Sequence, residues 1–441
     1  MKGSSADTRQ GPLGAGCASE RGHYRAFQLL LLAVATWGVT YARFTLGPLQ
    51  ESIRGSLGLT DNQIAWLQGP AVAVPMALAA IPLGLFVDRR RRAILFVPFA
   101  ALSFVGAALA SVTSSPYFIA ATRGITGLAL AAILVAAYSM VADLYPPAAR
   151  GRANTLVAMG EIAGSPAAFA LGGFLLALAP SQSSLPWQWA LLRMSAPLLL
   201  VVILMSFLRE PARGGMKGEG ASLRGVWLHL WQYRRVIGPL LFGRMTVWIA
   251  DGAVLVWAAP IFSRHFHLPP DRVGALIGIS LFISGVCGPL MGGTLADLCE
   301  RFGGPRRTMS ALSAVALCSV PAAMFANVSS PIVSCVMLTC FLTSGYVVGT
   351  AAISLATIVV PGELRGLYLA VTISVCALLF IGVAPLLVSL LAGALGGRDA
   401  LGHALTAVAA GTSLLGFAVF ACARKYFPLA STRLELAGST Q

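Results

Sequence analysis

Charged side chains are rare in this chain, yet several fall deep inside its long apolar segments. They are Arg43, Arg123, Arg193, Arg244, Glu161 and Asp251. Arginine presents a planar fork of N–H donors that can bind a carboxylate or a phosphate through two hydrogen bonds. A carboxylate in an apolar surrounding can take up or release a proton at accessible pH. These residue types therefore suit the binding of an anion and the coupling of that binding to protons.

Polar residues also repeat at the spacing of one helical face. Arg244, Trp248 and Asp251 follow the spacing i, i+4, i+7. Arg43 shares a face with Thr36 and Thr40. A longer stripe consists of Thr339, Thr343, Tyr346, Thr350, Ser354 and Thr357. Such stripes either line a wet cavity or bond a neighbouring helix and their own backbone, and both alternatives stay open.

Each buried charge also has a purely structural interpretation. Asp251 can neutralise Arg244 as an ion pair. Glu161 lies roughly 12 Å into its segment at 1.5 Å per residue, where it can titrate, act as a gate or accept a structural hydrogen bond. Arg193 lies near the end of its segment, so we expect its side chain to extend toward water.

The elements that must position these residues are membrane-spanning helices. Charged residues make up 11% and hydrophobic residues 57% of the 441 residues, whereas a soluble domain carries about 25% charged residues. Apolar segments of about 20 residues recur along the chain, as a helix needs to cross a bilayer. We predict an all-α membrane protein with twelve spans at 27–49, 64–87, 93–112, 117–144, 153–178, 189–207, 237–262, 273–296, 309–326, 332–360, 368–392 and 404–422.

Two short patterns occur once in each half of the chain. Gly84-x3-Asp88 is repeated as Gly293-x3-Asp297, and Pro-x3-Arg-Gly occurs at 146–151 and again at 361–366. Two unrelated patterns that recur at nearly one offset indicate an internal duplication. We therefore expect two pseudo-symmetric six-helix bundles, the construction on which alternating access depends.

The distribution of basic residues predicts the topology. The net charge is +15, but most of the positive charge falls in one set of connections, so it indicates membrane orientation rather than nucleic-acid binding. The opposite connections hold only Arg54, Arg264, Arg272 and Arg398. We expect both termini in the cytoplasm, with tails at 1–26 and 425–441, bundles at 27–208 and 237–424, and a linker at 209–236.

Several classes of chemistry lack their usual motifs. None of the three lysines follows a glycine, so no phosphate-binding Gly-Lys-Ser/Thr loop occurs. His-Glu-x-x-His and Gly-x-Ser-x-Gly are absent from the sequence, and its eight cysteines are scattered singly. His265-Phe-His267 suits a solvated interfacial pair better than a metal site. We expect no enzyme activity, cofactor or metal, and an ion gradient or solute exchange as the energy source.

The chain resembles the major facilitator superfamily over nearly its whole length. Gly84-x3-Asp88-Arg89 is similar to the superfamily's loop signature after the second span, and Arg123-x3-Gly127 to its fourth-span arginine motif. Tyr41-Ala-Arg43-Phe44 resembles the Spinster-like and organic-anion transporter branches. In the Spinster-like pattern carboxylates stand where this chain has Ala42 and Leu130, so that branch's coupling mechanism does not transfer.

The resemblance implies that spans one, four, seven and ten line a central cavity. The predicted solute-binding residues are Arg43, Thr40, Arg123, Arg244, Trp248, Tyr346 and Thr350, and the predicted proton-coupling residues are Asp251 and Glu161. Asp88, Arg89, Arg92, Asp143 and Asp297 are interpreted as a cytoplasmic latch. The alternative is that these charges only retain loops inside the cell.

The excess of arginine over deep carboxylates favours an anionic solute. We expect a monomeric secondary transporter in the bilayer of the cell inner membrane that moves a small organic anion, driven by a proton gradient or by a counter-substrate. One alternative is a multidrug or lipid-like exporter that exchanges its substrate for protons. A solute sensor or partner-binding membrane protein on a transporter scaffold is the alternative of another class.

Overall fold

The computed structural model describes residues 13–89, 91–180, 185–211, 234–359, 372, 375 and 378–427. Within these ranges the chain is helical, with no strand. The helices of the first half are α1 (Leu13–Phe44), α2 (Gln50–Leu57), α3 (Asp61–Gln68), α4 (Pro70–Arg89), α5 (Ala93–Ala110), α6 (Pro116–Leu144), α7 (Pro147–Ala177) and α8 (Pro186–Met205). The predicted linker lies almost wholly outside the described residues.

The second half begins with α10 (Arg234–Arg264) and α11 (Pro270–Ala322). It continues through η1 (Ala323–Asn327), α12 (Pro331–Val359), the π-helical turn η2 (Leu378–Val383), α14 (Ala384–Leu395), η3 (Gly397–Ala400), α15 (Leu401–Ala423) and η4 (Arg424–Tyr426). The predicted start of the eleventh span lies outside the described residues.

Helix α11 contains two spans rather than one. Its 53 residues would extend roughly 80 Å at 1.5 Å per residue, far more than the ~30 Å hydrocarbon core of a bilayer. The backbone breaks at Gly304, whose φ of 69° and ψ of −166° are not helical. Pro305 follows at once and lacks the N–H that would continue the helix. The described residues contain eleven helices long and apolar enough to cross a membrane; because α11 crosses twice, the predicted twelve spans are confirmed.

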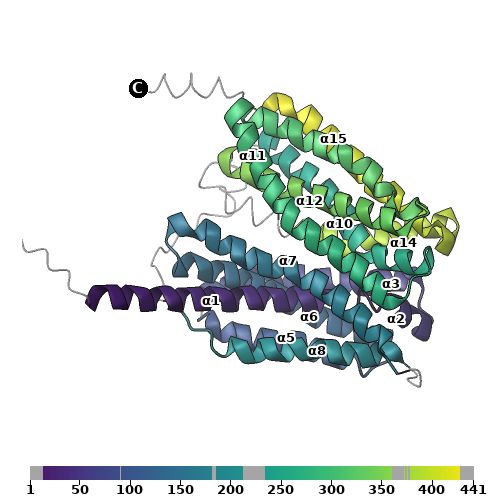
Figure 1. Ribbon diagram of the computed structural model, residues 1–441, viewed down its shortest axis with the longest axis horizontal. Coiled ribbons are helices and arrows are strands. Elements are labelled where there is room, and N and C mark those ends of the chain that lie inside the picture. Colours follow the sequence, from purple (N-terminus) through teal and green to yellow (C-terminus); the bar gives the residue numbers. More distant parts are fainter. Residues whose placement is uncertain are drawn as a thin grey trace, which may run out of the picture.

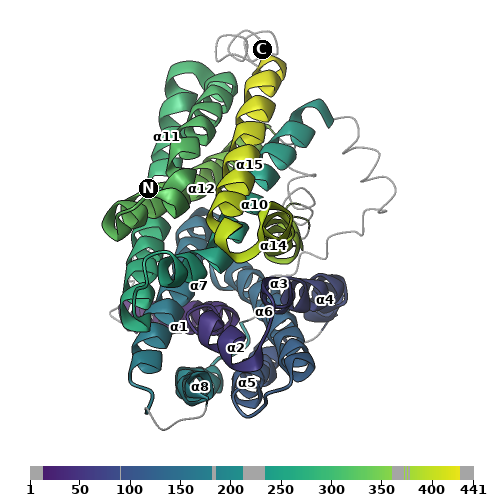
Figure 2. The same ribbon diagram turned by 90° about the vertical axis from the view of Figure 1, so that its right-hand side faces the viewer.

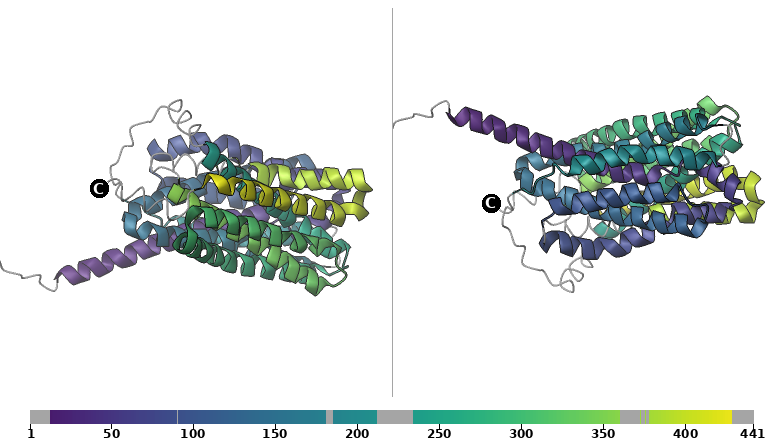
Figure 3. Two further views of the ribbon diagram at one scale, coloured as in Figure 1. Left: turned by 90° about the horizontal axis from the view of Figure 1, so that it is seen from above. Right: turned by 90° about the horizontal axis from the view of Figure 1, so that it is seen from below.

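The two halves of the chain form two bundles that lie side by side (Figure 1). Helices α1 to α8 make one bundle, and α10 to α15 make the other, as the view along the helices also shows (Figure 2). In Figure 1 the bundles meet near α2, α3 and α14 and diverge toward the opposite end. We call the first the α2 end and the second the terminal end, where α1 begins and α15 ends (Figure 3).

The hydrophobic cores follow the same division. One core joins both bundles and contains Tyr41 and Trp187 from the first with Trp257 and Phe341 from the second. Two further cores fill the bundles toward the terminal end, and among the described residues they are almost completely separate, since only Phe380 and Ile381 of η2 join the core of the first bundle. The described residues therefore hold the bundles together at the α2 end and leave them apart at the terminal end.

Glycines allow the closest approach between the bundles. Gly173 of α7 lies against Gly274 of α11, and a Cβ on either residue would collide with the backbone of the other helix. Gly69, between α3 and α4, packs in the same way against the carbonyls of Ile381 and Gly382 in η2. Small residues let helix backbones approach when lipid supplies no hydrophobic drive.

Candidate solute-binding site between the two bundles

The Arg43 side chain lies where the two bundles face each other. Arg43 is the residue before the last of α1 and is half-buried. Its Cζ lies 4.6 Å from the ring centre of Phe44 and 5.2 Å from that of Phe380, which belongs to the second bundle. Its charge also interacts with Glu161 of α7 and Tyr346 of α12. The sequence predicted Arg43 as a binding residue, and the structure surrounds it with groups from both halves.

Glu161 is a carboxylate whose charge interacts with Arg43. It projects from the middle of α7, and its Oε2 accepts a hydrogen bond of 3.0 Å from the Tyr138 hydroxyl of α6. Its charge acts on both Arg43 and Tyr346. Glu161 thus belongs to a polar cluster that also contains the predicted binding residues Arg43 and Tyr346. Tyr138, 37% exposed, was missed in the sequence because no helical pattern linked it to a charged residue.

Asp251 enters the cluster from α10. Its side chain is buried at 8% exposure, and its Oδ1 has no hydrogen-bond partner among the described residues. A Cβ on Gly345 of α12 would overlap this carboxylate, so the glycine makes room for it. The charge of Asp251 acts on the neighbouring Tyr346. Tyr346, predicted as a solute-binding residue, thus interacts with charged groups of both bundles, and solute binding by it stays a prediction.

Aromatic rings connect the remaining predicted residues of α10 to this cluster. The Cζ of Arg244 lies 4.2 Å from the ring centre of Trp248, a distance at which a cation is attracted to the ring face. The Trp248 ring in turn lies 5.6 Å from that of Phe380. Phe380 therefore contacts both Trp248 and Arg43, one from each bundle. It lies in the π-helical turn η2, a backbone irregularity often found at functional sites.

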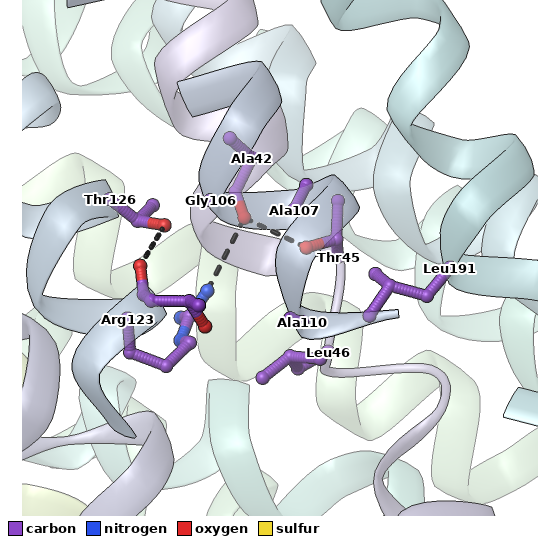
Figure 4. Close-up of a pocket in the computed structure, with 10 residues that line it drawn as sticks. Ala42, Thr45, Leu46, Gly106, Ala107, Ala110, Arg123, Thr126 and Leu191 are labelled. Carbon is purple, nitrogen blue, oxygen red and sulfur yellow. Dashed lines mark hydrogen bonds between the residues drawn. The ribbon is translucent and has the colours of Figure 1, made fainter. Parts of the chain in front are cut away.

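Arg123 has different surroundings from those expected. It is buried at 3% exposure, and its Nη1 and Nη2 donate to the carbonyl oxygens of Ala42 (3.3 Å) and Arg43 (2.6 Å). A cavity of about 10 Å³ beside it, lined in part by Thr45 and Thr126 (Figure 4), has room for about one water molecule. These contacts favour a role in holding the end of α1. Solute binding by Arg123 stays a prediction.

The hydroxyl stripes mostly serve helix packing. Thr36 donates to the Val157 carbonyl of α7 at 2.9 Å, and buried Thr40 packs close to Gly164 of the same helix. Thr339 and Thr343 donate to carbonyls of their own helix. Thr350 lies against Gly292 of α11. The side chain of Thr357 lies outside the described part. Of the two alternatives for these stripes, the described contacts favour packing, and binding by Thr40 and Thr350 stays a prediction.

Only some side chains of the predicted cytoplasmic latch lie in the described part of the chain. Arg92 Nη1 lies 2.6 Å from the Asp143 carboxylate and donates to the Ser139 carbonyl at 2.8 Å. This pair joins α5 to α6 within one bundle, so in the present arrangement it braces that bundle rather than linking the two. Asp297 is exposed near the kink of α11. The side chains of Asp88 and Arg89 lie outside the described residues, and their gating roles stay predictions.

A second charged cluster, which we call the α2-end cluster, consists of Glu51, Arg54, Asp61 and Arg264. Arg264, the last residue of α10, donates to both oxygens of Glu51 and both oxygens of Asp61 at 2.7–2.9 Å. In the sequence, Arg54 and Arg264 are notable only as two of the few basic residues in the connections opposite the arginine-rich ones. The i, i+3 spacing of Glu51 and Arg54 was a usable signal, but nothing in the sequence related them to Arg264.

The described geometry is that of a two-bundle membrane protein with a polar site between the bundles. The family model described as "Major Facilitator Superfamily" matches residues 32–385. The chain therefore belongs to the major facilitator superfamily, whose members are transporters and not enzymes.

Among proteins of known sequence, the human solute carrier family 2, facilitated glucose transporter member 6 is 26% identical over 179 residues. That segment is 40% of this chain and 33% of the human protein. The match thus spans about a third of the human relative.

Solved structures with the same fold cover nearly the whole chain. A bacterial homolog of the human lysosomal transporter Spinster, inward-facing and unoccupied, has a TM-score of 0.76 at 19% identity and covers 91% of this chain and 96% of its own. The nucleoside transporter NupG has a TM-score of 0.69 at 11% identity, with coverage of 90% and 99%. The xylose transporter XylE from E. coli, inward open, has a TM-score of 0.65 at 14% identity, with coverage of 89% and 94%. At these identities the likeness concerns the fold.

Proposed function

We propose that this protein is a proton-coupled secondary transporter of a small organic anion, acting as a monomer in the cell inner membrane. The observation that carries the proposal is the position of Arg43. Its guanidinium lies 5.2 Å from the ring centre of Phe380 in the other bundle, and its charge interacts with Glu161 of its own bundle and Tyr346 of the other. A solute bound there touches both bundles, so it can influence how they move relative to each other.

Competition for Arg43 would couple the solute to protons. While Glu161 is ionised, its negative charge offsets part of the positive charge of Arg43 and repels an anionic solute. A proton on Glu161 removes that negative charge and leaves the guanidinium fork available to the anion. Binding of the anion and of a proton therefore favour each other. The Tyr138 hydroxyl, which donates to Glu161 at 3.0 Å, would hold the carboxylate in place through the exchange.

The arrangement of the bundles supports an assignment of sides. We infer that the α2 end faces away from the cytoplasm, because the arginine-rich connections lie at the other end. The bundles pack together at the α2 end and separately at the terminal end. The structure then corresponds to an inward-facing state, from which solute would exchange with the cytoplasm.

Two observations bear on competing substrate classes. Aromatic rings at Trp248, Phe380 and Tyr346 would also suit a sugar, the substrate class in the names of the glucose and xylose transporters that the chain resembles. A sugar, however, has no charge for Arg43 to bind. A lipophilic cation, as a multidrug exporter would carry, requires the carboxylates to outweigh Arg43 and Arg244. We therefore favour the anion over both.

Ligand-dependent melting of the purified protein tests the proposal. The panel would contain small carboxylates, phosphate esters, sugars and lipophilic cations, each measured at acidic and at neutral pH. We expect an anion to raise the melting temperature, and to do so more at acidic pH. Uptake of that anion into proteoliposomes should then follow an imposed proton gradient. A sugar or a cation as the stabilising ligand would contradict the anionic assignment.

Arg43→Ala and Glu161→Gln separate binding from coupling. The first variant should lose stabilisation by the anion. The second imitates the protonated carboxylate, so it should bind the anion equally well at both pH values and still exchange it across the membrane. It should fail to accumulate the anion against a gradient. Normal accumulation by Glu161→Gln would show that the proton binds elsewhere, with Asp251 as the next residue to test.

A further inference from the structure

The α2-end cluster contains two arginines, Arg54 and Arg264, that approach the same two carboxylates. Arg264 already occupies both carboxylates through four hydrogen bonds of 2.7–2.9 Å. Arg54 lies 3.4 Å from Glu51 and 3.9 Å from Asp61. All four side chains are largely buried, at 13–22% exposure. Arg54 is thus close to the same two acids, but at longer distances than Arg264.

The two arginines belong to different bundles. Arg264 ends α10, whereas Arg54 lies in α2 between the two acids that it approaches. When the α2 end opens, Arg264 must leave with its bundle. Glu51 and Asp61 would then keep their negative charge in a partly buried position, which is costly unless a cation replaces the one that left.

The local backbone holds Arg54 ready for this replacement. Gly58 ends α2 with a left-handed φ of 63°, and its N–H bonds the Arg54 carbonyl. Thr60 and Gln63 then form a capping box at the start of α3, which fixes Asp61 at the first helical position. The bonds of this short connection lie within the first bundle, and they keep Glu51, Arg54 and Asp61 close together.

We propose that Arg54 and Arg264 exchange as partners of Glu51 and Asp61 during the transport cycle. Arg264 holds the acids when the α2 end is closed, and Arg54 takes them over when it opens. Arg54 is then a positioning residue that lowers the cost of the open state, while Arg264 stabilises the closed one. Neither residue needs to touch the solute, so the proposal is independent of what is transported.

Distances between spin labels test the exchange in the full-length protein in lipid nanodiscs, without solute. One pair, Gly55→Cys and Ile332→Cys on a cysteine-free background, reports on the α2 end. Both positions are exposed, and a Cβ at Gly55 meets no other atom within 4 Å. A second pair, Arg152→Cys and Leu298→Cys, uses exposed positions on α7 and α11 near the terminal end.

Arg264→Gln should lengthen the α2-end distance and shorten the terminal-end distance. We expect the ratio of open to closed forms at the α2 end to rise by about tenfold or more. Arg272→Gln, which alters an exposed arginine at the start of α11, is the matched control and should change neither distance. An unchanged distribution in Arg264→Gln would show that the α2-end cluster does not hold the closed form.

Arg54→Gln distinguishes exchange from simple membership of the closed cluster. It is best measured on an Arg264→Lys background, which keeps the charge but lacks the fork and should populate both forms. Under the exchange proposal, Arg54→Gln lowers the open fraction there, and Arg54→Lys largely restores it. If Arg54→Gln instead raises the open fraction or leaves it unchanged, Arg54 belongs only to the closed arrangement and the exchange is wrong.

Discussion

The Tyr138 hydroxyl donates a hydrogen bond of 3.0 Å to the Glu161 carboxylate, and this contact joins α6 to α7 beside Arg43. A donor of this kind favours the ionised form of a carboxylate. Tyr138→Phe should therefore make Glu161 easier to protonate. Under the proposed competition, anion binding should then persist to higher pH than in the unaltered protein. Titration of ligand-dependent melting against pH would measure the shift, and a shift to lower pH would contradict the assigned competition.

Substitutions of Arg43 should distinguish the contribution of its positive charge to solute affinity from that of its planar fork. Arg43→Lys keeps the positive charge but loses the planar fork, so the affinity for the anionic solute should fall by about tenfold or more, as expected for one charge-assisted bond lost. Arg43→Ala should bind still more weakly. Binding assays with both variants would test this once a stabilising anion has been found. Equal affinity in all three proteins would place the solute elsewhere.

Gly345 should be required for the position of Asp251. An added Cβ at residue 345 would overlap the Asp251 carboxylate, and overpacking of this kind costs about 1–3 kcal/mol. Gly345→Ala should therefore lower the melting temperature in detergent. Gly349→Ala on the same helix is the control, because its Cβ would lie 3.5 Å from Trp248 Nε1, an ordinary contact. Equal melting of the two variants would show that Asp251 moves aside freely.

Gly173 should control the close packing of the α2 end. A Cβ there would collide with the Pro270 carbonyl and Gly274 of the other bundle. Gly173→Ala should therefore favour the arrangement in which α7 and α11 separate, with little loss of the fold itself. The α2-end label pair would report a longer distance. Gly238→Ala, whose Cβ meets no atom within 4 Å, should leave the distance unchanged; the same response from both variants would argue against a specific contact.

The predicted orientation can be tested in the segment at 209–235, which the sequence places in the cytoplasm. Single cysteines introduced there should be protected from a membrane-impermeant reagent in intact cells and react after the cells are opened. A cysteine at exposed Gly55 should react in both cases. Labelling of the 209–235 segment in intact cells would reverse the assignment of sides.

The sequence was sufficient to predict the spans because length and hydropathy are nearly the only requirements for crossing a bilayer. Even the division of α11 was predicted, since Gly303, Gly304 and Pro305 interrupt two apolar segments. The short helices α2 and α3 were not predicted as separate elements, because α2 falls in a predicted connection and α3 overlaps the start of the predicted second span. The sequence contains the Thr60 and Gln63 pattern of the capping box that starts α3. Its importance depends on Arg264, however, which is distant along the chain.

The arrangement of the candidate site was harder to predict from the sequence than the spans were. The charge of Arg43 interacts with Glu161 and Tyr346, and that of Asp251 with Tyr346, as expected because a charge in lipid needs a partner or water; their roles in binding and coupling stay predictions. The direction of a side chain around its helix axis was harder to infer. Arg123 was expected to face the cavity, and only the packing of α6 against α1 reveals that its guanidinium meets main-chain carbonyls. Phe380 gave no signal, since an aromatic residue in an apolar segment is ordinary.

The attachment of Arg123 to α1 has a consequence for evolution. Its guanidinium binds the carbonyl oxygens of residues 42 and 43, and every amino acid supplies such an oxygen. The end of α1 can thus stay anchored whatever side chain stands at position 43. A lineage could exchange Arg43 for a neutral or acidic residue, and so acquire a different cargo, without first rebuilding the helix contacts that keep this part of the scaffold in place.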